Sequence, residues 1–160
     1  MTIALAIVAC GSTTEALQTA EFSPAGLTLS IDKSAYSRAD LDPGSGNGVR
    51  ATLVGSTEQP YYSRLGDAFN GALDQNPLFV AEGSDGSLER QSGGSWVKVV
   101  GVPLVEGVRE VVISTSKSYS LIAHASPPIQ AGTYRISLKL RGTAGGPVSA
   151  TITSPPFEVR

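Results

Sequence analysis

Few residues of this sequence could take part in nucleophilic or acid–base chemistry. The single histidine is His124, and the single cysteine is Cys10. A serine or threonine nucleophile needs a neighbouring base, usually a histidine, and no GxSxG motif presents a serine here. His124 stands in a strand-like pattern two residues before a Ser-Pro-Pro run, which is typical of a surface or strand-end histidine. We therefore predict no catalytic residues and no enzymatic activity.

The carboxylates are spaced as in turns rather than as in a metal or glycosidase site. Zinc needs three or four His, Cys or carboxylate ligands at short spacing, and residues 11–160 hold one histidine and no cysteine. Oxygen-rich groups occur in two loops, at Asp67, Asn70, Asp74 and Asn76 and at Asp40 and Asp42. Neither group matches an EF-hand loop, and Asp and Asn favour turns. The pairs Glu106/Glu110 and Glu82/Asp85 are expected at solvated strand ends. No metal and no cofactor are predicted.

The first residues resemble a bacterial lipoprotein signal. An apolar run ends in Ile7-Val8-Ala9-Cys10, which resembles a lipobox. In such signals the chain is cleaved before the cysteine, which then carries acyl chains that anchor the protein. We predict a signal remnant at 1–9, a lipidated Cys10, and a flexible tether over 10–26. The alternative is an ordinary N-terminal β-strand; a spanning helix needs roughly 20 apolar residues, which this run lacks.

The charge pattern argues against nucleic acid as a partner. Charged residues are 16% of the chain and the net charge is −2. No Lys/Arg run occurs, and the longest basic feature is the alternation of Arg135, Lys139 and Arg141. A nucleic-acid site needs a clustered basic patch or an aromatic ladder. The predicted partners are instead the membrane, through the lipid on Cys10, and another envelope protein, so the expected location is the cell envelope after export.

Period-two alternation recurs from Leu27 onward. The clearest example sets Tyr134, Ile136, Leu138 and Leu140 against polar neighbours, and similar runs start near Leu27, Val49, Val108 and Tyr119. Alternation with one polar face is typical of half-buried antiparallel strands. Turn signals separate the runs, including Gly93-Gly94 and the Ser-Pro-Pro that interrupts the last strand. Residues 66–77 lack alternation and are predicted to form an inserted loop.

Four segments together suggest a family. They are LTLSIDKSAYS, SLERQSGGSWVKV with Trp96, QAGTYRISLKL, and PPFEVR. The stretch Gly132-Thr133-Tyr134-Arg135 resembles the entry to a penultimate strand, where a tyrosine hydroxyl bonds back across a corner. The chain from residue 27 to 160 therefore resembles the small bacterial immunoglobulin-like domains of exported lipoproteins, which are related to an immunoglobulin-like group of proteinase inhibitors. The resemblance implies an all-β, immunoglobulin-like antiparallel β-sandwich of about 7–9 strands, without catalytic residues.

Aromatic residues supply the candidate binding surface. Tyr61 and Tyr62 follow Pro60, and because adjacent strand residues face opposite ways, one of the two is expected to point outward. Phe69 lies in the inserted loop, so these residues could form a contact region together. Trp96 follows a Gly-Gly turn and is expected either to pack on the sheet or to serve as an exposed anchor.

Three functions remain open. The leading hypothesis is a non-catalytic, membrane-anchored interaction or structural module of the cell envelope, with the loop 66–77 and its tyrosines as the contact region. The second is a proteinase inhibitor that presents an exposed loop. The third is a calcium-assisted carbohydrate or small-ligand binding module.

Overall fold

The protein has an all-β fold. A computed structural model of the chain describes residues 26–55, 59–66, 77–99, 101, 107–114 and 117–160. Strands account for 57% and helices for 6% of these residues, so the predicted all-β class is confirmed. The signal remnant 1–9, the tether up to residue 25 and nearly all of the inserted loop 66–77 lie outside the described residues.

The described residues form twelve strands and two short helical segments. In chain order these are β1 (Leu27–Ile31), β2 (Ala35–Tyr36), α1 (Arg38–Leu41), the 3-10 turn η1 (Pro43–Ser45), β3 (Val49–Gly55), β4 (Tyr61–Gly66), β5 (Leu78–Val80), β6 (Gly86–Ser92), β7 (Ser95–Lys98), β8 (Val108–Ile113), β9 (Ser118–Ala123), β10 (Gly132–Arg141), β11 (Val148–Thr153) and β12 (Phe157–Val159).

All strands belong to one curled, mixed sheet. The main path runs β1-β3-β9-β5-β4-β10-β12-β2, while β11 and β6 also pair with β10, β7 pairs with β6, and β8 pairs with β4. The prediction of an antiparallel arrangement of about 7–9 strands is therefore wrong in strand direction and in strand number. The described residues form twelve strands, and two of the strand pairs are parallel. β5 pairs with β9, and β12 pairs with β2, in the parallel direction. In both pairs the partners are far apart in the sequence, so no tight turn forces them to be antiparallel.

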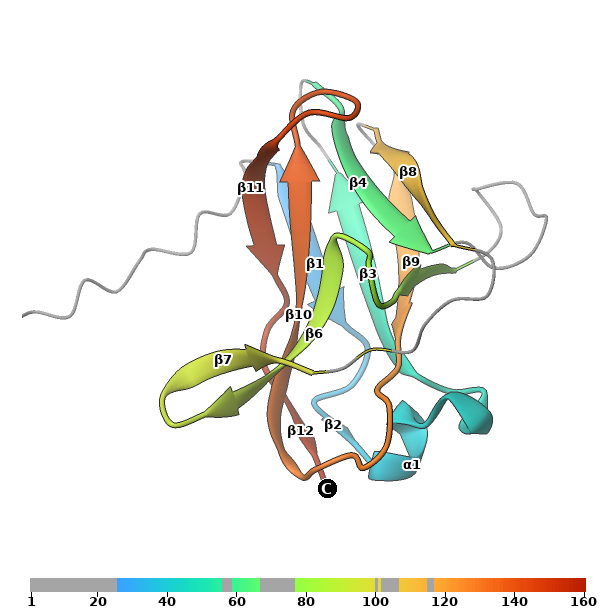
Figure 1. Cartoon of the computed structure of the whole chain (residues 1–160), viewed down its shortest axis with the longest axis vertical. Coiled ribbons are helices and arrows are strands. Elements are labelled where there is room, and N and C mark those ends of the chain that lie inside the picture. The colour runs from blue at the N-terminus through green and yellow to red at the C-terminus, as the bar shows by residue number, and fades with distance from the viewer. Residues whose placement is uncertain (1–25, 56–58, 67–76, 100, 102–106, 115–116) are drawn as a thin grey trace, which may run out of the picture.

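The apolar side of each alternating run faces the core. In β3 buried and exposed residues alternate along the whole strand, as the sequence pattern predicts. Figure 1 shows β1, β3 and β9 as the more distant layer behind β10, β11 and β4, and the core lies between these strands. Its largest fully buried side chains include Tyr134, Phe157, Leu53, Leu121 and Ile136. Each such side chain contributes about 1.5–3 kcal/mol by leaving water.

Strand β10 pairs with four other strands, and a tyrosine near its start bonds back to the loop that precedes it. The hydroxyl of Tyr134 donates to the Gln130 carbonyl at 2.6 Å. The Tyr134 ring stacks on Phe157 at 6.2 Å between centroids, and Tyr36 meets Phe157 edge-on at 5.2 Å. These three aromatic rings close one end of the core and fix the position of the loop that precedes β10.

The hairpin β6–β7 also follows its sequence signal. Ser92 pairs with Ser95, and the two residues between them, Gly93 and Gly94, both have positive φ, of 57° and 82°. Positive φ at both central positions defines a type I′ turn, whose twist matches that of antiparallel strands. Figure 1 shows this hairpin projecting away from the rest of the sheet.

Candidate functional site

The two tyrosines of the predicted contact region lie on opposite faces of β4. Tyr61 is half-buried against the core, while Tyr62 pairs with Val112 of β8 and Arg141 of β10. Ser63 and Leu65, on the same face as Tyr61, are fully buried, so Tyr62 belongs to the outward face. Phe69, the third residue of that region, lies outside the described residues.

Trp96 is a half-buried residue of β7 rather than a core residue. The Arg135 guanidinium lies over its ring, 4.4 Å from the centroid, and the Nε of Arg135 donates to a Glu89 carboxylate oxygen at 2.8 Å. This stack covers one side of the indole and holds the hairpin against β10. Trp96 therefore packs on the sheet through Arg135, and the other expected role, an exposed anchor for a partner, stays a prediction.

The structure does not bring Trp96 and the tyrosines together. Trp96 lies beside Arg135 near the start of β10, whereas Tyr62 pairs with Arg141 at its end. Six residues of extended strand span roughly 20 Å. A single surface made of Tyr62 and Trp96 would have to cover that distance, so the candidate binding residues do not form one site.

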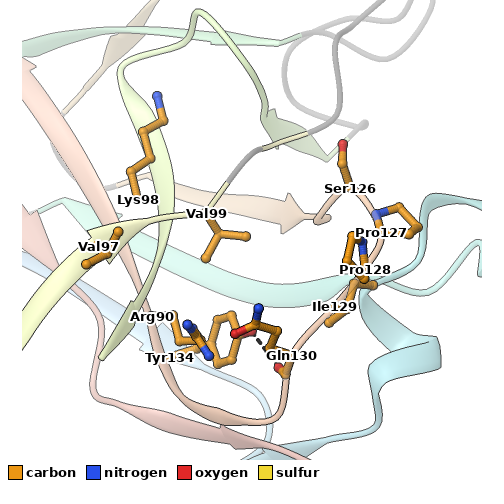
Figure 2. A pocket seen from close by; sticks show the side chains of 10 residues that line it. All are labelled: Arg90, Val97, Lys98, Val99, Ser126, Pro127, Pro128, Ile129, Gln130 and Tyr134. Carbon is orange, nitrogen blue, oxygen red and sulfur yellow. Dashed lines mark hydrogen bonds between the residues drawn. The ribbon is translucent and has the colours of Figure 1, made fainter. Parts of the chain in front are cut away.

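A different group of residues surrounds an open cleft. It has a volume of about 360 Å³ and lies between the inner face of hairpin β6–β7 and the loop before β10 (Figure 2). That volume falls in the range typical of ligand pockets, about 300–1,000 Å³. The lining residues are Arg90, Val97, Lys98, Val99, Ser126, Pro127, Pro128, Ile129, Gln130 and Tyr134.

The loop 125–130 forms one wall of the cleft and is fixed at both ends. The Ala125 N–H donates to the Leu41 carbonyl at 3.0 Å, and the Ser126 hydroxyl donates to the Gly101 carbonyl at 3.0 Å. At the other end Gln130 accepts the hydrogen bond from Tyr134. These bonds hold the Pro-Pro segment opposite the hairpin, so this wall is present without a ligand.

The hairpin forms the opposite wall, and its register decides which side chains face the cleft. Arg90 pairs with Val97, and the Val99 N–H donates to the Leu88 carbonyl at 2.8 Å. Side chains alternate between the two faces of a strand, so Arg90, Val97 and Val99 share the inner face with buried Leu88. Trp96 lies on the outer face, away from the cleft. Figure 2 shows the Lys98 side chain also pointing away from it.

Arg90 is the charged group of the cleft and has no counterion in the described part of the chain. Two other arginines of the sheet do have carboxylate partners: Arg135 binds Glu89, and Arg141 binds Asp85. Figure 2 shows the Arg90 guanidinium next to the Tyr134 ring and Gln130. Burial raises the pKa of Tyr134, while the positive charge of Arg90 acts in the opposite direction. The cleft therefore combines apolar walls with the positive charge of Arg90, which no carboxylate of the described residues neutralises.

Arg90 is not among the predicted binding residues, although the sequence carries a signal for it. In the SLERQSGGSWVKV segment the period of two places Leu88 and Arg90 on one face. A cation on the apolar side of an alternating strand is unusual and marks a position where the core gives way to a polar site. The loop wall has no comparable signal, because its approach to the hairpin depends on tertiary contacts.

His124 directly follows β9, which agrees with the predicted strand-end position. It is half-buried, and its ring stacks on Phe79 with centroids 6.4 Å apart. Its Nδ1 is buried and has no hydrogen-bond partner. Burial is the main cause that lowers the pKa of His124 from its ordinary value, so the neutral imidazole is favoured in the folded protein.

The acidic residues of the described loops act as structural caps. Asp40 and Ser37 form a reciprocal capping box at the start of α1, and Asp42 accepts from the Gly44 N–H at 2.8 Å. Their predicted turn-forming role is confirmed. Asp85, by contrast, is buried and binds Arg141 through both carboxylate oxygens, at 2.7 and 3.1 Å, so it is not a solvated strand end. Within the described ranges no group of three or more potential metal ligands is present.

The comparisons with known proteins return no match, whether the chain is compared with protein-family models, curated proteins or solved structures. Among the described residues no helix has the length and apolar character needed to cross a membrane.

Proposed function

We propose that this chain is a non-catalytic binding module of the cell envelope, held at the membrane by lipid on Cys10, and that its ligand site is the cleft between hairpin β6–β7 and the loop 125–130. The observation that carries the proposal is Arg90, whose guanidinium lies on the rim of an apolar cleft and has no carboxylate partner among the residues that the structure describes. An uncompensated charge against apolar walls costs free energy, and an anionic ligand removes that cost.

The envelope location is supported by the sequence. The Ile7-Val8-Ala9-Cys10 run has the residue types of a lipobox, and polar residues separate it from β1. The immunoglobulin-like character of the domain is supported by the alternating strands, the two-layer core and the hydrogen bond from Tyr134 to Gln130. Such domains present binding sites on loops that a rigid sheet positions.

The cleft favours a ligand that has an anionic group on an apolar body. Val97, Val99 and Ile129 offer apolar contacts, while the guanidinium of Arg90 offers several N–H donors to a carboxylate or sulfonate. A strongly polar ligand such as a bare sugar would leave these apolar walls unused. The carbohydrate and inhibitor alternatives therefore receive no support from the cleft.

A fluorescence titration with anilinonaphthalene sulfonate tests this proposal, because the dye is an anion on an apolar ring system. We expect saturable binding to the folded protein, and Arg90→Gln should weaken it roughly tenfold through loss of a charge-assisted bond. Lys139→Gln is the matched control, since it removes the same charge from an exposed position of β10 that does not line the cleft. No saturable binding, or equal weakening by both variants, would contradict the proposal.

A further inference from the structure

The outer edge of β7 is an unpaired strand edge beside the cleft. Of the strands in the described ranges only β6 pairs with β7. Hydrogen-bonded and non-bonded pairs alternate along an antiparallel ladder. The Val99–Leu88 hydrogen bond therefore places Arg90–Val97 among the bonded pairs. It follows that the backbone N–H and C=O groups of Trp96 and Lys98 point away from β6, where an added strand would meet them.

From this edge and the adjoining cleft we infer that the ligand is an extended peptide segment of a partner protein, with one acidic side chain bound to Arg90. The inference rests on the proposed function, because it names the ligand of the same cleft. Strand addition supplies main-chain hydrogen bonds, and pockets that accept alternate side chains supply specificity.

The register sets where the acidic residue lies. Trp96 and Lys98 flank Val97. A peptide strand that bonds to both therefore has one residue directly opposite Val97, and the peptide continues in both directions from that residue. That residue projects its side chain onto the inner face, where Arg90 lies without a carboxylate partner in the described ranges. The carboxylate therefore belongs to an internal Asp or Glu rather than to a chain end.

The next inward-facing residue of the peptide meets the apolar part of the cleft. Two positions along the strand its side chain lies beside Val99, with Ile129 and Pro128 on the opposite wall. The recognised peptide thus carries an acidic residue beside Val97 and an apolar residue beside Val99, with one unrestricted residue between them. Whether the acidic residue comes first in the peptide sequence depends on the direction in which the peptide pairs with β7. Charge complementarity at Arg90 and apolar complementarity at Val99 together define this pattern.

Selection from a randomised peptide library tests the inference, with each peptide displayed as an N-terminal fusion so that no free C-terminus is available. We expect enriched peptides to contain an acidic and an apolar residue two positions apart. Synthetic, C-terminally amidated versions should bind the wild-type protein and the control Lys139→Gln equally, because Lys139 does not line the cleft. Arg90→Gln should lose roughly 10- to 100-fold in affinity, because a hydrogen bond to a charged group is removed.

A second variant tests the strand edge separately. Lys98→Pro removes an N–H that points away from β6 and therefore spares the hairpin ladder, and it should lose affinity as strongly as Arg90→Gln. If Lys98→Pro does not keep the wild-type melting temperature, peptides that are N-methylated at alternate residues block the same pairing from the ligand side.

The outcomes separate the two proposals. Selection without a consensus, or peptides that bind Arg90→Gln and Lys98→Pro like the wild type, would overturn the peptide inference. If the dye still binds in an Arg90-dependent way, the cleft remains a ligand site and only its assignment to a peptide is lost. If neither dye nor peptide binds, both proposals are wrong.

Discussion

At the scale of single residues, a buried serine forms hydrogen bonds with backbone groups that have no partner in the sheet. Ser154 lies between β11 and β12, where the chain leaves the ladder beside two prolines. Its hydroxyl accepts from the Ile136 N–H and donates to the Pro155 carbonyl, both at 2.9 Å. The side chain thus replaces a ladder bond that the interrupted strand does not supply, which explains a buried serine at this position.

We predict that Ser154→Ala lowers the free energy of unfolding by about 1–3 kcal/mol, because the buried Ile136 N–H is left without an acceptor. Ser30→Ala is the control: the Ser30 hydroxyl donates to the Thr52 carbonyl at 3.3 Å from an exposed position, so the change should be within about 0.5 kcal/mol. Urea unfolding followed by circular dichroism measures both. Equal effects in the two variants would refute the assigned role of Ser154.

At the scale of elements, the loop before β3 depends on one glycine that lies close to other atoms. Gly48 has φ +74°, and a Cβ at this position would lie 2.4 Å from Cγ2 of Ile122. Gly46 has nearly the same φ, +72°, but no atom within 4 Å of its Cβ position. The two glycines therefore separate the effect of backbone conformation from the effect of packing.

Gly46→Ala should cost about 1–2 kcal/mol, the usual cost of a left-handed conformation for an L-residue. Gly48→Ala should cost at least about 1–3 kcal/mol more, since Ile122 or the His124 ring must also move. Thermal unfolding of the two variants gives the difference directly. A Gly48→Ala protein as stable as Gly46→Ala would contradict the close packing of Ile122 and His124 around Gly48.

The pH dependence of stability belongs to the same element, because His124 packs beside Gly48. The pKa of His124 is lowered from 6.5 chiefly by burial, so the unfolded chain binds a proton at a higher pH than the folded protein does. Stability due to this group is therefore present above about pH 6.5 and is lost as the pH falls below that value. Asp42 and Arg50 influence the same pKa in opposite directions.

We expect the free energy of unfolding of the wild type to decrease from pH 7 toward pH 5.5, and the decrease to be smaller in His124→Gln. Urea titrations at each pH measure it. The control is Arg50→Gln, which keeps the histidine and should keep the downward slope. A wild-type protein that gains stability over this range would contradict the environment described for His124.

The strands that the sequence predicts are those with local alternation and a local turn. β10 and the β6–β7 hairpin, with Gly93 and Gly94, are examples. β2 and β5 could not be predicted in this way, because two or three residues carry no period and both strands pair in parallel with segments far along the chain. The candidate site divides similarly. Arg90 stands out within its own strand, but the loop 125–130 lies opposite it only through bonds to Leu41, Gly101 and Tyr134.

At the scale of the whole molecule, the proposed lipid anchor at Cys10 would hold the proposed binding domain at the membrane. We predict that wild-type protein expressed in bacteria incorporates labelled palmitate and sediments with membranes, whereas Cys10→Ser does neither, because attached acyl chains are the proposed anchor. The purified Cys10→Ser protein should keep the circular dichroism and melting temperature of the wild-type domain. Unlabelled wild-type protein in the soluble fraction would refute the anchor and leave the cleft unaffected.

The most direct test of the central claim is a map of backbone amide shifts during titration with the dye or a selected peptide. We predict that the shifts concentrate at Arg90, Val97 and Val99 and in the loop around Ile129, and that the amide shift of Tyr62 does not change. Shifts that centre on Tyr61 and Tyr62, or that spread evenly over the sheet, would contradict the claim that the cleft beside Arg90 is the binding site.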